Sequence, residues 1–191
     1  MHLDSLRYTT RAMPWQPQAI AFTVALILVG SDTVPFVVAT ILLSTAAGFA
    51  LDDPAHEVTA ASATPLLRRR LRRVVVVVTP TTAVWAGLAA WQGTEGAEET
   101  WGLSLMFFGL TGLSLGIAGS VGRRSNGRGG QVVAPTVLVL LILSSIAKPR
   151  WRPMPLGDIP GGWPQIYVRW ALVGLVGILA FLVSSRDPAR N

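Results

Sequence analysis

The sequence contains no cysteine, which excludes disulfide bonds, thiolate metal sites and cysteine nucleophiles. Charged residues are scarce as well: they make up 14% of the 191 residues, whereas soluble domains carry about 25%. Hydrophobic residues reach 51% and the mean hydropathy is +0.50. A single domain of this length cannot bury that much apolar surface in its own core, so most of its surface is expected to face lipid.

Basic residues exceed acidic ones, 16 to 10, which gives a formal net charge of +6 and an isoelectric point near 11.2. In a soluble protein this excess would suggest nucleic-acid binding. Here the arginines stand between apolar runs, where basic residues orient loops in a bilayer. No nucleic-acid partner is therefore expected.

Six stretches without ionisable residues are close to the roughly 20 residues that a helix needs to cross a bilayer, except for one arginine near the start of the sixth. Backbone groups in lipid must be satisfied internally, and the alternating pattern of a barrel is absent, so these stretches predict helices. The expected fold is all-α: a single domain over residues 1–191, built as a polytopic membrane bundle of six transmembrane helices. The spans are expected at 13–31, 33–51, 74–94, 100–122, 129–147 and 165–185.

The arginines also predict the orientation of the bundle. With a cytoplasmic N-terminus, 12 Lys and Arg residues fall on the inside and 4 on the outside, as the positive-inside rule requires. The lead 1–17 and the tail 186–191 are then cytoplasmic, and the chain is a multi-pass protein of the cell membrane. Aromatic residues cluster toward the outer ends of the later spans and predict an interfacial belt: Trp91, Trp101, Trp151, Trp163, Tyr167 and Trp170.

The fourth span carries a stripe of glycines at spacings of three and four, which lie on one helix face. Gly112 and Gly116 form a small-xxx-small pair that lets another helix backbone approach closely, so the stripe predicts a tight crossing. Glycine is also common in membrane helices generally, and that remains the alternative. The stripe consists of Gly109, Gly112, Gly116 and Gly119.

No ionisable residue lies in the middle of a span, and both histidines, His2 and His56, fall in aqueous segments. Ion-coupled transport and membrane catalysis both need such groups, so neither an enzyme nor a metal site is expected. The glycine-rich loop 122–130 lacks the Lys-Ser/Thr ending of a phosphate-binding loop. If the chain transports a substrate, a separate subunit must supply the energy.

The loop 51–73 between the second and third spans is longer than a connection requires and carries helix signals of its own. Asp53 can cap a helix, Pro54 suits its first position, and Glu57 lies in the first turn, where the helix dipole favours an anion. Thr64 and Pro65 then begin a second helix that continues into the membrane. The arginines in it are a cytoplasmic basic anchor for anionic lipid: Arg68, Arg69, Arg70, Arg72 and Arg73.

This loop resembles the coupling helix of permease subunits in ATP-binding-cassette exporters of the type-2 superfamily. The likeness rests on the six spans, the cytoplasmic N-terminus, the acidic Glu57, the stretch 61–65 and the basic run 68–73. The Gly-Thr pair that follows the acidic residue in that family is replaced here by Val58-Thr59. The resemblance implies that an ATPase subunit contacts Asp53, Pro54, His56, Glu57, Thr64 and Pro65.

The same resemblance implies a half-permease, in which a copy or a sister subunit completes the pathway and separate ATPase subunits bind ATP and Mg. No cofactor is then expected in this chain. The family also places a re-entrant or interfacial segment between the last two spans, where this chain has the Pro- and Trp-rich extracellular segment 148–164. A proline-stiffened surface loop explains that segment equally well.

A different class of function fits the same features. A non-transporting scaffold or accessory subunit could anchor a larger membrane complex through the loop and the glycine stripe. It would show no ATP-dependent flux and would not associate with a nucleotide-binding protein.

Overall fold

The computed structural model describes residues 15–30, 36–52, 65–92, 97–123, 128–146 and 163–186. Within these ranges the chain is helical, with six α-helices, two short 3₁₀ helices and no strand. The predicted all-α class is confirmed for this part of the chain.

Each of the six apolar stretches forms a helix, including the third, in which the helix continues through Pro80. The two long and apolar enough to cross a membrane by length and composition are Leu66–Gln92 and Thr100–Gly122. The apolar parts of the others are shorter. The helices are α2 (Gln16–Gly30), α3 (Phe36–Ala47) continued by η1 (Gly48–Leu51), α5 (Leu66–Gln92), α6 (Ala97–Gly122), η2 (Gly130–Val132) leading into α7 (Val133–Ile146), and α8 (Trp163–Ser184).

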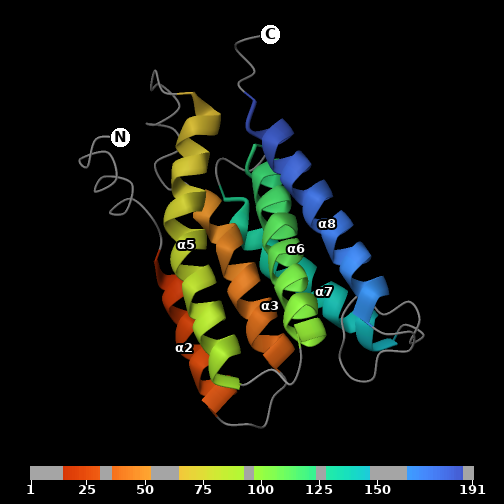
Figure 1. Cartoon of the computed structure of the whole chain (residues 1–191). Coiled ribbons are helices and arrows are strands. Elements are labelled where there is room, and N and C mark those ends of the chain that lie inside the picture. The colour runs from red at the N-terminus through yellow and green to blue at the C-terminus, as the bar shows by residue number, and fades with distance from the viewer. Residues whose placement is uncertain are drawn as a thin grey trace.

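Successive helices alternate in direction, so the bundle has two distinct ends (Figure 1). α3 lies at the centre and packs against α2, α5, α6 and α7, while α6 packs against α3, α7 and α8. α8 is attached chiefly through α6. The start of α5 and the ends of α6 and α8 come together at the upper end in Figure 1.

An aromatic stack joins three helices in the core. The Trp85 ring of α5 lies 5.0 Å from the Phe107 ring of α6 in a stacked arrangement and 6.1 Å from the Phe36 ring of α3. Its indole Nε1 donates to the Thr40 hydroxyl over 3.1 Å, and that hydroxyl donates to the Phe36 carbonyl. The polar end of the tryptophan is therefore satisfied inside an apolar core, as buried indoles require.

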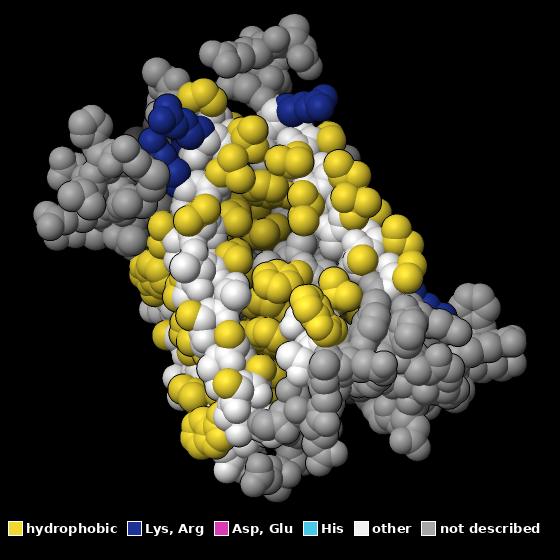
Figure 2. Space-filling view, in the orientation of Figure 1, with side chains coloured by type: hydrophobic (Ala, Val, Ile, Leu, Met, Phe, Trp, Pro, Cys, Tyr) yellow, Lys and Arg dark blue, Asp and Glu magenta, His cyan; other side chains and the backbone are white. Residues whose placement is uncertain are grey.

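The outer faces of the bundle are apolar. Ile20 and Ile27 of α2 are each 64% exposed, Val75 of α5 is 58% exposed, and Val176 of α8 is 63% exposed. Figure 2 shows hydrophobic side chains over much of the visible surface between the two ends. Monomeric soluble proteins rarely expose apolar area on this scale.

Not all residues predicted for the aromatic belt are exposed at the surface of the bundle. Trp91 and Trp101 are 70% and 67% exposed at the end opposite the α5 arginines. Trp170 is only 3% exposed, because it packs against Gly109 of α6. The belt interpretation is wrong for this residue. The side chains of Trp151, Trp163 and Tyr167 lie outside the described set.

Candidate functional site

The end of the bundle at which α5 begins carries a polar cluster built on arginines. α5 starts at Leu66, directly after Pro65, whose carbonyl accepts the first helical hydrogen bond from the Arg69 amide over 3.2 Å. Proline fits a helix start because it has no N–H that would be left unpaired. The helix then runs through the arginines into the apolar stretch without a break. The arginines are therefore held rigidly at the end of a long helix.

The five arginines of this helix start do not share one environment. Arg70 and Arg73 are 9% and 6% exposed, whereas Arg68 is exposed and Arg69 and Arg72 are half-buried. A spacing of three places Arg70 and Arg73 on the same helix face, which is the face turned toward the bundle. The sequence predicts that all five form one surface anchor, but in the structure Arg70 and Arg73 face the inside of the bundle.

Arg70 links α5 to the ends of α6 and α8. Its Nη1 donates to the Ser184 carbonyl at 3.0 Å and lies 3.5 Å from the Gly119 carbonyl. The hydroxyls of Ser185 and Ser184 accept from the same nitrogen at 3.3 and 3.4 Å. The last carbonyls of a helix lack intrahelical partners, and the helix dipole favours a cation there. Arg70 therefore acts as a shared C-terminal cap for two helices of the bundle.

Arg73 links α5 to the end of η1. Its Nη1 donates to the Asp52 carbonyl over 3.1 Å, and the Asp52 Oδ1 accepts from the Gly130 amide over 2.6 Å. Burial raises the pKa of Asp52, and the Gly130 hydrogen bond and the positive charge of Arg128 offset part of that rise. Asp52 thus connects the end of η1 to the starts of α5 and η2.

The expected coupling helix lies between these two arginine links. Residues 53–64 lie outside the described residues, whereas Asp52 before them and Pro65 after them are described. Asp52 is held by Arg73, and the helix that follows Pro65 is held by Arg70. Of the predicted ATPase contacts, only Pro65 belongs to the described chain; Asp53, Pro54, His56, Glu57 and Thr64 do not.

The glycine stripe of α6 lies against α8. A Cβ atom added at Gly109, Gly112 or Gly116 would come within 2.6, 2.8 or 2.5 Å of a backbone carbonyl oxygen of α8. At Gly119 it would come within 2.6 Å of the Ser184 hydroxyl. Gly109, Gly112 and Gly116 therefore require the absence of a side chain for the helices to come this close, whereas at Gly119 rotation of the Ser184 hydroxyl would make room.

Sequence reasoning identified one side of this glycine contact and missed the other. A Cβ at Gly174 of α8 would lie 3.0 Å from the Gly109 Cα, and one at Gly177 would lie 2.4 Å from the Gly112 carbonyl oxygen. A spacing of three between two glycines in a predicted span is a readable signal. This spacing predicts a particular helix contact only when it is compared with the matching glycine stripe of the fourth span. Asp52 and Ser184 were missed as well, since their role depends on partners far away in the chain.

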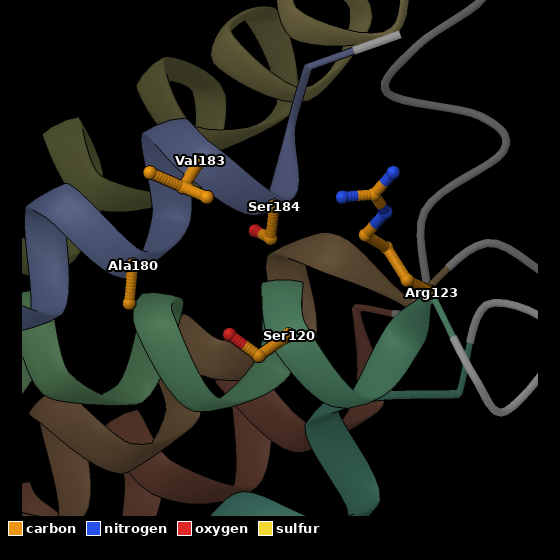
Figure 3. A pocket seen from close by; sticks show the side chains of 5 residues that line it. All are labelled: Ser120, Arg123, Ala180, Val183 and Ser184. Carbon is orange, nitrogen blue, oxygen red and sulfur yellow. The ribbon is translucent and has the colours of Figure 1, made fainter. Parts of the chain in front are cut away.

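A shallow, open pocket of about 570 Å³ lies between the last turns of α6 and α8, next to the Arg70 cap. Figure 3 shows the side chains that line it: Ser120 of α6 and Arg123, which directly follows α6, on one side, and Ala180, Val183 and Ser184 of α8 on the other. The pocket combines an apolar wall with two hydroxyls and one guanidinium. Among the described residues, no group of three or more His, Asp or Glu side chains could hold a metal ion.

No protein-family model, no curated protein and no solved structure matches this chain. The arrangement of the arginine links, the glycine contact and the pocket is therefore what bears on function.

Proposed function

We propose that the chain is a multi-pass membrane protein whose arginine-rich end faces the cytoplasm. The support is the combination of apolar outer faces with charges confined to the ends. Exposed apolar surface costs about 25 cal/mol per Å² in water and nothing in lipid. The 15 residues of α2 cover about 22 Å, less than a hydrocarbon core of about 30 Å, and local bilayer thinning accommodates such short spans.

The distribution of arginines supports this orientation. Eight described arginines lie where α5 and η2 begin and α6 and α8 end, and one, Arg169, lies near the start of α8. In Figure 2 the dark-blue side chains gather mainly near the upper end, with a smaller patch at the lower right. Short loops rich in arginine are retained in the cytoplasm. Reporter fusions after residues 60 and 94 test this: activity typical of the outside at residue 60 would refute it.

We further propose that the chain is the permease half of an exporter driven by ATP-binding-cassette subunits. The observation that carries the proposal is that both flanks of segment 53–64 are held by buried arginines. Arg73 holds Asp52 at one flank, and Arg70 ties the helix at the other flank to α6 and α8. A subunit that displaced this segment would pull on η1, α5, α6 and α8 together.

In this mechanism the ATPase subunits bind ATP and Mg, close on each other and move segment 53–64. Helices linked by the Arg70 and Arg73 hydrogen bonds follow as rigid bodies, which is the usual basis of such transitions. The bundle tilts against its partner permease, a copy or a sister subunit, and releases a hydrophobic or amphiphilic substrate on the outside. This chain supplies positioning and no catalytic group.

Co-purification tests this proposal directly. The full chain is extracted from its native membrane in mild detergent and assayed for an associated ATPase. Scrambling residues 54–64 is expected to abolish the association, whereas scrambling 153–162, expected on the opposite side, is expected to leave it intact. Arg70→Gln is expected to retain the ATPase but to lower ATP-driven flux. Association that survives the first scramble would refute the mechanism.

The scaffold alternative loses one of its two attachment points. It used the glycine stripe to bind another protein, but Gly109, Gly112 and Gly116 pack against α8 of the same chain. A scaffold would have to use segment 53–64 alone or an exposed apolar face. Co-purification with proteins that bind no nucleotide, together with absence of ATP-dependent flux, would favour it.

A further inference from the structure

The glycines bring the backbones of α6 and α8 together, and side chains of both helices flank one side of the contact. We call this strip of surface the groove; its hollowed part is the pocket at the arginine-rich end. On α6 the flanking side chains are Leu113, Ile117 and Ser120, which follow one another at spacings of four and three. On α8 they are Val173, Val176, Ala180 and Val183, at spacings of three and four. Such spacings place each set on one helix face.

The groove is apolar along most of its length and polar at one end. Ile117 and Val173 are half-buried and Val176 is exposed, so an apolar surface faces outward between the helices. The pocket of Figure 3 lies at the arginine-rich end, where Ser120, Arg123 and Ser184 replace the aliphatic side chains. A ligand matching the whole groove must therefore be apolar along most of its length and polar at one end.

The charges at that end favour an anion. Arg123 is exposed and lines the pocket (Figure 3), and the described residues that line the pocket include no carboxylate. Arg70 lies beside the pocket and Arg186 is exposed just beyond the end of α8. The C-termini of α6 and α8 lie here, and their helix dipoles contribute about half a negative charge each. The three positive charges of Arg70, Arg123 and Arg186 exceed this negative charge.

We propose that this groove binds an anionic phospholipid. The phosphate lies in the pocket, where the Arg123 guanidinium and the Ser120 hydroxyl donate hydrogen bonds to it. The Ser184 hydroxyl already donates to the Phe181 carbonyl over 2.9 Å and forms the floor. One acyl chain follows Ile117, Val173 and Val176 toward the middle of the bundle.

A lipid fits this groove better than a free phosphate does. A pocket of about 570 Å³ with the Ala180 and Val183 side chains as its wall is larger than a phosphate ion and only partly polar. The pocket also lies at the height of the arginine-rich end, where the headgroups of the cytoplasmic leaflet are expected. The proposal depends on the membrane embedding proposed above and is independent of the permease function.

Lipid binding by the purified full chain tests the proposal. Dioleoyl phosphatidylglycerol, dioleoyl phosphatidylcholine and inorganic phosphate are titrated in mild detergent, and bound lipid is counted by native mass spectrometry. We expect phosphatidylglycerol to bind about tenfold more tightly than phosphatidylcholine. Arg123→Gln is expected to remove this difference. Ser120→Phe, which fills the pocket without changing the charge, is expected to weaken phosphatidylglycerol binding about as much.

Arg68→Gln is the matched control, because it removes one exposed arginine from the same end of the bundle, on α5 instead of α6. Its phosphatidylglycerol affinity is expected to stay within about twofold of the unmodified chain. Equal losses in Arg68→Gln and Arg123→Gln would show a diffuse charge effect and overturn the site, as would unchanged binding in Ser120→Phe. Displacement of the lipid by equimolar inorganic phosphate would show that the acyl chain contributes nothing, which also overturns it. Absence of an associated ATPase would refute the permease function and leave these results unaffected.

Discussion

Replacing Gly116 by alanine tests how tightly α6 and α8 are packed. The added Cβ would lie 2.5 Å from the Gly177 carbonyl oxygen and 2.9 Å from its Cα. Cβ atoms in real structures essentially never approach a heavy atom within 3.0 Å. The helices must therefore separate by at least about 0.5 Å, and because both contacts are backbone atoms, no side-chain rotation can relieve the clash.

The expected size of the effect follows from two opposing terms. Overpacking of this kind costs about 1–3 kcal/mol. Alanine also gains about 0.5–1 kcal/mol over glycine in a helix interior. Gly87→Ala on α5 isolates the second term, since a Cβ there meets nothing within 4 Å. The difference in unfolding free energy between the two variants then equals the steric cost, about 1–3 kcal/mol.

Unfolding of the purified chain by sodium dodecyl sulfate in mixed micelles, followed by circular dichroism, measures this difference. Gly116→Ala is expected to unfold at a lower detergent fraction than the unmodified chain, and Gly87→Ala at an equal or higher one. If Gly116→Ala proves as stable as Gly87→Ala, the close approach of α6 and α8 is refuted.

Three further substitutions probe other links in the bundle. Arg70→Met removes the shared cap of α6 and α8 and is expected to destabilise the bundle by about 1.5–3 kcal/mol. The control Arg68→Met, at an exposed position, should lower the unfolding free energy by less than about 0.5 kcal/mol in the same assay. Folding raises the pKa of Asp52 above its usual value of 3.8, so the folded state binds the carboxyl proton more tightly than the unfolded state does. The unfolding free energy should therefore fall as the pH rises from 3.8 through the raised pKa. Asp52→Asn should remove that slope, and an unchanged pH profile would show that Asp52 is not its source. Trp85→Phe loses the hydrogen bond to the Thr40 hydroxyl and should cost about 1–3 kcal/mol, while a cost near zero would mean that the indole N–H is not paired there.

Local properties of the chain were sufficient to predict the helices. Long apolar stretches with few ionisable residues predicted helices, and the six stretches match six helices to within a few residues, apart from α5. That helix begins at Leu66, about two turns before the expected span at Val74, because Pro65 starts a helix that continues through the arginines. The expected continuation of helix from Pro65 into the span was itself readable from the sequence.

The environment of individual side chains was not readable in this way. Arg70 and Arg73 look identical to Arg68, Arg69 and Arg72 in sequence, and only the packing of α5 against the bundle decides which of them are buried. Trp170 looks like a belt residue at the end of a span, but a glycine on α6 leaves room for its ring. The partners lie elsewhere in the chain: Arg70 donates to Ser184, 114 residues away, Arg73 donates to Asp52, 21 residues away, and Trp170 packs against Gly109 of α6.

The sequence by itself determined that this protein is helical, where its long apolar stretches lie, and that its arginines concentrate between particular stretches. These are consequences of composition and of local spacing. Only the tertiary structure decided that the glycine stripe of α6 meets Gly174 and Gly177, that Arg70 caps two helices at once, and that a polar pocket ends the groove between them. Such features depend on which helix faces which, and that choice is made by complementary surfaces distant in the chain.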